Sequence, residues 1–157
     1  MQRNIDKEYC FQCKNQGCFV LRYFSPEEIV SISEAKKIRF YKKDEIIYRE
    51  GEIPEGIYFV YNGCLKTTKT ALHNKQIDLF YNEQGEILGY RSVINSEPHS
   101  TSAVAYSNSL VCEISKDYFL NSFLNDKNFS ENFLKYLTEE VWARQKRIEE
   151  FESFRND

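Results

Sequence analysis

The feature that most constrains the fold is a series of short β-forming segments that runs from Ile38 to Ile114. Runs of β-branched and aromatic residues alternate there with glycine, asparagine and aspartate turns about every 8 to 12 residues, a spacing typical of sandwiches and barrels. The expected strands cover residues 38–41, 46–48, 57–61, 65–71, 76–81, 85–89, 101–106 and 110–114. The aromatic fraction of 15% fits this interpretation, because aromatic side chains suit the half-buried face of a sheet.

The pair Asn62-Gly63 marks a turn after the strongest of these segments, residues 57–61. Both positions of an Asn-Gly pair tolerate a positive φ, which is typical of a two-residue hairpin turn. We therefore expect residues 57–61 and 65–71 to be paired neighbours in one hairpin, with residues 76–81 as the next strand.

Helical signals flank the strands. In Ser25-Pro26-Glu27-Glu28, a serine N-cap, a proline at the first helical position and a glutamate that completes a capping box predict a helix to about Ala35. Ser115-Lys116-Asp117 opens a second, short helix that runs through Leu124.

The last segment of the sequence predicts a long helix, capped by Ser130 and running from about Glu131 to Phe154. Its apolar residues recur at near-helical spacing, and they are Phe133, Leu137, Val141, Ile148 and Phe151. About 24 residues span roughly 36 Å at 1.5 Å per residue, which is longer than a small barrel. The apolar stripe needs a further surface, and a second copy of the chain is the simplest one, so we expect a homodimer through this helix. The alternative is a stripe that packs only on its own barrel.

Charge and composition argue against several classes of protein. The net charge of -3 does not suggest the basic face of a DNA-binding domain, and the pairs Lys36-Lys37 and Lys42-Lys43 are interpreted as solvated surface because acidic residues lie nearby. There is no run of 18 apolar residues and no signal-peptide apolar region, so we expect a cytoplasmic protein without membrane contact. We expect no enzymatic activity, since the two histidines lie apart and no hydrolase, P-loop or zinc-protease motif occurs.

The ordered segments resemble the Crp/Fnr superfamily of transcription regulators. The resemblance rests on residues 41–52, 57–63, 85–89 and 110–114, whose glycines sit where the barrel of that family turns. It implies a mainly β fold with helices, namely a double-stranded β-helix (jelly-roll, cyclic-nucleotide-binding-like) barrel followed by a long C-terminal dimerisation helix. The expected division is a cysteine-bearing N-terminal arm at 1–24, a sensor barrel with flanking helices at 25–124 and the dimerisation helix at 125–157.

Members of this superfamily usually continue past the long helix into a helix-turn-helix DNA-binding module. This sequence ends at Asp157 without such a module. We favour a fragment of a longer regulator over a naturally short protein. We therefore expect no nucleic-acid binding by this chain alone, and DNA binding only where a C-terminal domain follows it.

The same resemblance allows a comparison with the members that bind cyclic nucleotides. These members carry a Gly-Glu-Leu, whose Glu holds the ribose, and later an Arg-Ser/Thr-Ala, whose Arg pairs with the phosphate. Here Gly89 is followed by Tyr90-Arg91, and the later segment reads Pro98-His99-Ser100-Thr101-Ser102-Ala103. Because a buried phosphate needs a cationic partner, we expect no cyclic-nucleotide binding and interpret Arg91 as a surface loop residue.

Five cysteines occur in a chain expected to be cytoplasmic, where metal ligation and redox chemistry are commoner than structural disulfides. Cys10, Cys13 and Cys18 place three thiols within nine residues, so they can share one metal centre. A site with four cysteine ligands needs one more thiol, from Cys64 or Cys112. The alternatives are Zn²⁺ in a structural all-cysteine site, or thiols and disulfides without a metal.

The cysteine arrangement resembles the Fnr-type oxygen sensors, which carry an N-terminal cysteine cluster and one barrel cysteine in a Val-Cys-Glu-Ile context. Residues 111–114 match that context, although four residues separate Cys13 from Cys18 where the best-known members have five. The resemblance implies that Cys10, Cys13, Cys18 and Cys112 ligate a [4Fe-4S] cluster, whereas Cys64 matches no ligand position. The implied function is detection of oxygen or redox state by the sensor domain of a transcription regulator. The alternative is a related module that binds a small effector in the barrel, with structural zinc or no metal.

Overall fold

A computed structural model describes Cys10 and residues 18–156 of the chain. Cys13 lies outside the described residues, as does most of the arm expected at residues 1–24. The described chain divides into two compact units with a boundary between Asn121 and Ser122. The first unit holds the strands and the candidate site.

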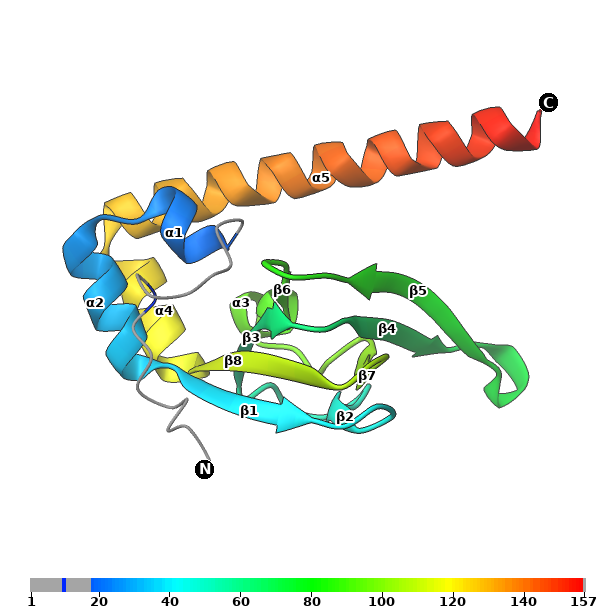
Figure 1. Cartoon of the computed structure of the whole chain (residues 1–157), viewed down its shortest axis with the longest axis horizontal. Coiled ribbons are helices and arrows are strands. Elements are labelled where there is room, and N and C mark those ends of the chain that lie inside the picture. Colours follow the sequence, from blue (N-terminus) through cyan, green and yellow to red (C-terminus); the bar gives the residue numbers. More distant parts are fainter. Residues whose placement is uncertain (1–9, 11–17, 157) are drawn as a thin grey trace. The chain divides into compact units, whose positions relative to one another are not determined.

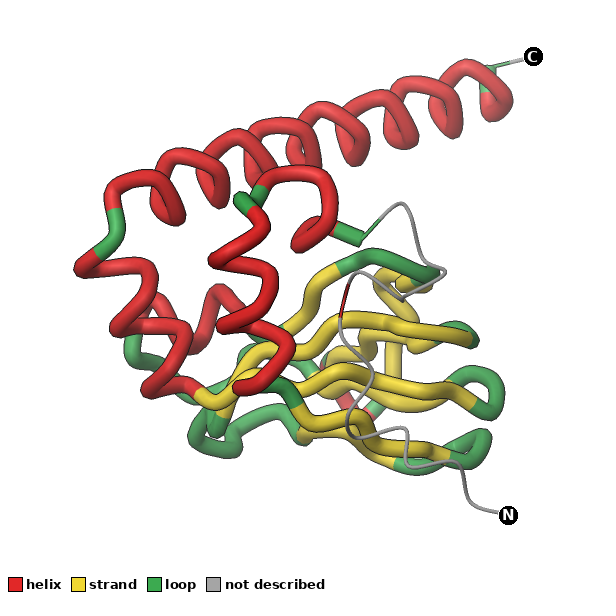
Figure 2. The backbone as a smooth tube through the Cα atoms, turned by 60° about the vertical axis from the view of Figure 1, so that its left-hand side comes forward, coloured by secondary structure: helices red, strands yellow, loops and turns green. Residues whose placement is uncertain are grey.

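In the described part of the chain, eight strands form two four-stranded antiparallel sheets (Figure 1). They are β1 (Lys37–Tyr41), β2 (Ile46–Tyr48), β3 (Gly56–Asn62), β4 (Leu65–Thr70), β5 (Gln76–Asn82), β6 (Ile87–Leu88), β7 (Ser102–Ala105) and β8 (Ser109–Ser115). The first sheet has the order β1-β8-β3-β6 and the second has the order β2-β7-β4-β5. Figure 2 shows the strands of both sheets running side by side. This distribution of early and late strands over two facing sheets is a jelly-roll, so the predicted fold class is confirmed.

The core of the first unit is a cluster of buried apolar residues from both sheets. Val60 on β3 and Val111 on β8 are fully buried in it. The cluster consists of Tyr48, Tyr58, Val60, Leu65, Leu88, Ala103, Ala105 and Val111. The next residue along β3, Phe59, points to the opposite face of the first sheet, because side chains alternate along a strand. There the helices α1 (Phe19–Tyr23) and α2 (Pro26–Ala35) cover the sheet, and the Phe19 and Phe59 rings stack with centroids 6.5 Å apart.

The hairpin predicted at Asn62-Gly63 is wrong. Strand β3 pairs with β6 and β8, whereas β4 pairs with β5 and β7, so this turn carries the chain from one sheet to the other. Gly63 has a φ of +96°, and a Cβ added there would collide with Ser109 Oγ. The glycine therefore serves a close crossing of two chain segments, and the hairpin is formed instead by β4 and β5.

Helix α2 begins and ends where the sequence predicts it. Ser25 N donates to Glu28 Oε2 at 2.8 Å and Glu28 N donates to Ser25 Oγ at 3.3 Å, so the predicted capping box is confirmed. The short helix expected to open at Ser115-Lys116-Asp117 and run through Leu124 corresponds to α4 (Lys116–Asn125). The sequence does not predict α1, α3 (Tyr90–Asn95) or the 3-10 turn η3 (Leu72–Asn74), because three to six residues are too few to show a helical period.

The second unit is dominated by α5 (Lys127–Arg155), which has 29 residues. At 1.5 Å per residue its length is roughly 43 Å. The predicted N-cap at Ser130 is wrong, because Asp126 caps the helix by accepting a hydrogen bond from Phe129 N at 3.1 Å. Ser130 lies within the first turn, where its Oγ donates to the Asp126 carbonyl at 3.1 Å. Among the described residues, no helix has the length and apolar character that crossing a membrane requires.

Candidate functional site

A pocket on the outer face of the first sheet brings together thiols that are far apart in the sequence. Cys10, Cys18 and Cys112 all line it. The other described residues that line it are Val20, Leu21, Ile32, Lys36, Phe59, Val60, Tyr61 and Ile114. The walls are mainly apolar, and the polar groups among these residues are three thiols, one ammonium and one phenol.

Helix α2 positions Cys10 against the pocket. Cys10 is 6% exposed, and its backbone N donates to Ser33 Oγ at 2.9 Å. Ser33 Oγ in turn donates to the Ile29 carbonyl at 2.7 Å, which fixes the serine rotamer on the helix. These two hydrogen bonds therefore hold Cys10 at a defined place against α2.

Lys36 approaches the same thiol from the end of α2. Its Nζ lies 3.5 Å from Cys10 Sγ, and the residue is only 6% exposed. The prediction that Lys36 belongs to the solvated surface is therefore wrong, whereas its neighbour Lys37 is exposed. A signal for this burial exists in the sequence, since Ile29, Ile32 and Lys36 fall at the i, i+3 and i+7 positions of one helix face.

Cys112 is held by strand pairing on β8. It lies between Ile38 of β1 and Phe59 of β3 in register, on the sheet face that α1 and α2 cover. Cys18 precedes α1 directly, and its carbonyl accepts hydrogen bonds from Leu21 N at 3.1 Å and Arg22 N at 3.2 Å. Strand β8 and the N-terminus of α1 thus position two of the three thiols.

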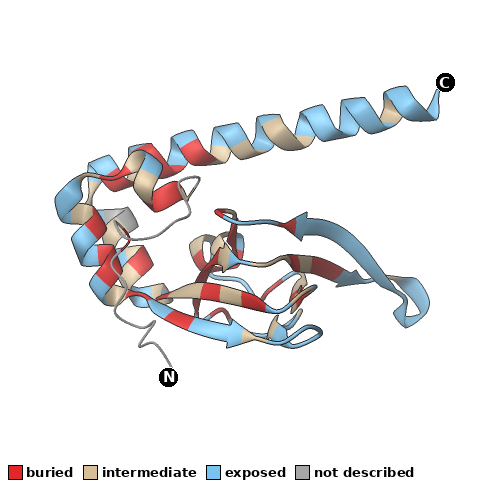
Figure 3. Ribbon diagram, viewed as in Figure 1, coloured by how far each residue is buried: buried red, intermediate tan, exposed pale blue. Residues whose placement is uncertain are grey.

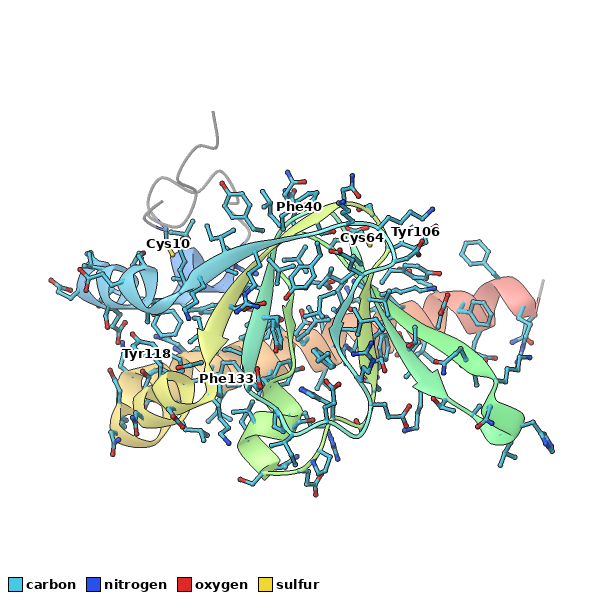
Figure 4. The ribbon with its side chains drawn as sticks, turned by 90° about the horizontal axis from the view of Figure 1, so that it is seen from below. Cys10, Phe40, Cys64, Tyr106, Tyr118 and Phe133 are labelled. Carbon is cyan, nitrogen blue, oxygen red and sulfur yellow. The ribbon has the colours of Figure 1, made fainter. Side chains whose placement is uncertain are left out.

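Three of the four predicted ligands therefore line one pocket, and the fourth, Cys13, lies outside the described residues. Within the described part of the chain, no three His, Cys, Asp or Glu side chains form a group that could hold a metal ion. Cys64 lies well away from Cys10, after the turn between the sheets (Figure 4). Burial, with smaller contributions from Glu83 and Glu86, raises the pKa of the Cys64 thiol above its usual value.

The residues compared above with the nucleotide phosphate cassette lie in and after α3. Gly89, with a φ of +84°, begins α3. Arg91 is exposed and its guanidinium forms an ion pair with Glu97 at 3.4 Å. Further along, His99 is buried and stacks on Tyr48, with ring centroids 3.9 Å apart. Burial lowers the pKa of His99, so this segment places a neutral imidazole in the interior.

A second pocket lies at the end of the β1, β3 and β8 strands. Glu113 accepts a hydrogen bond from Tyr41 OH at 2.5 Å and pairs with Arg39 Nε at 2.9 Å. Burial, and then the charge of Glu113, raises the pKa of Tyr58 to about 12. The lining residues are Ala35, Lys37, Arg39, Glu55, Gly56, Tyr58, Glu113, Ile114 and Ser115. No sequence motif marks this pocket, because its charged residues come from three separate segments.

The predicted dimer stripe on α5 is partly buried and partly exposed. Phe133 is fully buried and Leu137 is half-buried, so Phe133 is not part of the exposed surface. Val141, Ile148 and Phe151 are 66%, 64% and 67% exposed. Figure 3 shows the C-terminal part of α5 as mostly exposed.

Comparisons with known proteins agree with this architecture. The sequence model of the cyclic nucleotide-binding domain matches residues 38–126. An uncharacterized protein of Haemophilus influenzae is 25% identical over 125 residues, which cover 78% of this chain and 95% of that protein. Human cGMP-dependent protein kinase 2 is 23% identical over 94 residues, which cover 59% of this chain and 12% of the kinase.

Solved structures share the fold at low sequence identity. DNR from Pseudomonas aeruginosa has a TM-score of 0.74 at 17% identity, covering 90% of this chain and 63% of that chain. The sensor domain of DNR, described as a transcriptional regulator, has a TM-score of 0.69 at 16% identity, covering 83% and 88%. The Thermus thermophilus catabolite activator protein has a TM-score of 0.69 at 19% identity, covering 83% and 62%.

The share of each known protein that this chain covers differs from one protein to the next. The chain spans nearly all of the Haemophilus protein and most of the DNR sensor domain, but under two thirds of the other DNR chain and of the catabolite activator protein. The domain model covers more than half of this chain, and the cysteine pocket lies on the jelly-roll that the solved regulators share. This chain therefore belongs to the cyclic nucleotide-binding domain family, with structural neighbours among regulators of the Crp/Fnr type.

Proposed function

We propose that this chain is the sensor domain of a Crp/Fnr-type transcription regulator and that it detects oxygen or redox state through a [4Fe-4S] cluster. The proposed ligands are Cys10, Cys13, Cys18 and Cys112. The observation that carries the proposal is the pocket that Cys10, Cys18 and Cys112 line together with a buried lysine. Promoter binding and a cytoplasmic location are proposed for the whole regulator, with α5 as the dimer seam.

The spacing of the described thiols favours an iron-sulfur centre over a single zinc ion. A zinc ion needs all its ligands within one coordination sphere of about 2.3 Å. The described thiols line one pocket without forming such a group. A [4Fe-4S] cluster is bound by four thiolates, each on a different iron, so its ligands lie further apart around a larger centre.

The surroundings also suit such a centre. The described pocket walls are mainly apolar, and cluster properties depend on limited solvent access and on hydrogen bonds to the sulfurs. A bound cluster would supply an oxygen-sensitive link between the N-terminal segment and strand β8. The chain's own part is to hold Cys112 rigidly by strand pairing and to hold Cys10 through Ser33, so that both ends of this link have defined positions.

The test is anaerobic reconstitution with iron and sulfide, followed by metal and sulfide analysis and visible absorption. Serine replacements should abolish the chromophore at Cys10, Cys13, Cys18 and Cys112. Cys64→Ser is the matched control, and it should retain the chromophore because Cys64 lies outside the pocket. Uptake of zinc without iron or sulfide by the wild type, or loss of the chromophore in Cys64→Ser, would contradict the proposal.

A second candidate function is favoured by the pocket at the strand ends. Arg39, Glu113 and Tyr58 offer a cation, an anion and a phenol there, which would suit a small polar effector. In this alternative the cysteines hold structural zinc or remain without metal. A ligand screen on Glu113→Gln and wild-type protein separates the candidates, since effector binding should weaken in the variant while iron uptake stays unchanged.

A further inference from the structure

The cysteine pocket contains a buried cation that needs an explanation. Lys36 is 6% exposed, and its backbone N donates to the Ile32 carbonyl at 3.0 Å, which completes the last turn of α2. Lysine is rarely buried unless its charge is paired, because an ammonium that loses its water without compensation is strongly unfavourable. The position of Lys36 is thus set by the helix, whereas its burial calls for an anionic partner.

The described surroundings of this ammonium contain thiols but little negative charge. Lys36 Nζ lies 3.5 Å from Cys10 Sγ, and none of the described residues that line the pocket carries a carboxylate. A neutral thiol is a weak acceptor, whereas a thiolate carries the charge that a buried ammonium needs. The pocket as described therefore suits an anionic occupant that includes the sulfur of Cys10.

We infer that Lys36 is a positioning residue for the proposed centre. Its ammonium donates a hydrogen bond to the Cys10 thiolate and balances the negative charge of the thiolate ligands. This inference rests on the proposed function. Groups that hydrogen-bond to metal ligands orient them and control how tightly the centre is held. Ser33 on α2 and Lys36 at its C-cap act together on Cys10, since Ser33 accepts a hydrogen bond from its backbone N and Lys36 donates one to its sulfur.

The first experiment compares Lys36→Met, Lys36→Arg and the control Lys37→Met, in which the neighbouring exposed lysine loses the same charge. Each reconstituted protein is challenged anaerobically with an iron chelator, and the loss of visible absorption is followed. Groups that support metal ligands change metal affinity by about 10- to 100-fold, so Lys36→Met should lose iron faster than the wild type by up to about this factor. Lys36→Arg should be intermediate because it keeps the charge, and Lys37→Met should match the wild type.

A second measurement distinguishes charge balance from simple packing. In the metal-free, thiol-reduced protein, Lys36→Met should be at least as stable to urea as the wild type, because it replaces a buried charge with an apolar chain of similar length. Clear destabilisation of metal-free Lys36→Met, or equal iron retention in Lys36→Met and wild type, would overturn the inference while leaving the cluster intact. Failure of the wild type itself to take up iron and sulfide would instead refute the proposed function, and the inference with it.

Discussion

Gly63→Ala is expected to destabilise the first unit strongly, because Gly63 lies where the chain passes from one sheet to the other. Its φ is +96°, in the left-handed region that favours glycine. An added Cβ would lie 2.7 Å from the Asn108 carbonyl oxygen and 2.8 Å from Ser109 Cα, and it would also collide with Ser109 Oγ. Two of these three neighbours are backbone atoms, so a change of side-chain rotamer cannot relieve the overlap.

Gly51 provides a matched control for the magnitude. Its φ is +87°, but no atom lies within 4 Å of an added Cβ. Both alanine variants adopt a left-handed backbone, which costs about 1–2 kcal/mol. The overlap at Gly63 adds about 1–3 kcal/mol, as other overpacked sites do. We therefore expect Gly63→Ala to lose about 2–5 kcal/mol of unfolding free energy, against about 1–2 kcal/mol for Gly51→Ala.

The assay is urea unfolding of both variants and the wild type, followed by far-ultraviolet circular dichroism. For a slope of about 1–3 kcal/mol per molar urea, the additional destabilisation should lower the midpoint of Gly63→Ala by roughly 1 M relative to Gly51→Ala. The slopes should remain equal, since the fold buries the same surface in all three proteins. Equal midpoints for the two variants would refute the reasoning, because the close approach of Ser109 would then be energetically unimportant.

Ser25→Ala should lose about 1 kcal/mol of stability in the same assay, because it removes one half of the capping box on α2; no change would contradict that role. Burial lowers the pKa of His99, so the stability that depends on its neutral form is complete above about pH 6.5 and is lost as the pH falls below that value. His99→Phe should therefore lose less stability than the wild type between about pH 7.5 and 5.5, and parallel losses would count against this effect. Replacing Val141 and Ile148 together with Asp should give monomers in sedimentation, whereas a wild-type monomer at tens of micromolar would argue against a dimer. Calorimetry with cyclic AMP and cyclic GMP should show no binding tighter than about 1 mM, and micromolar affinity would contradict the interpretation of the cassette.

The amino-acid sequence was sufficient to predict a sandwich or barrel of short strands, which the family resemblance narrowed to a jelly-roll, and the best-signalled helix. Short β-forming segments between turn residues specify strands, and the capping box at Ser25 specifies where α2 begins, because both signals act within a few residues. The local signal for a helix start was ambiguous where two capping residues lie close together in the sequence. Asp126 and Ser130 are both good caps, and the structure selects the earlier one, so that α5 starts a turn before the predicted position.

The sequence also placed three thiols within nine residues and a fourth in a strand, but only the tertiary structure decided which of them share a pocket. Cys112 joins Cys10 and Cys18 because β8 lies between β1 and β3 on the face that α1 and α2 cover. That pairing places Cys112 opposite Ile38 and Phe59, which lie far from it in the sequence. The same applies to Gly63 and to Lys36. An Asn-Gly pair permits a positive φ, but it does not specify whether the strands on its two sides pair with each other. A lysine at a helix end is buried or solvated according to what packs on that helix face. Local backbone preferences are contained in neighbouring residues, whereas burial and long-range pairing depend on the whole fold.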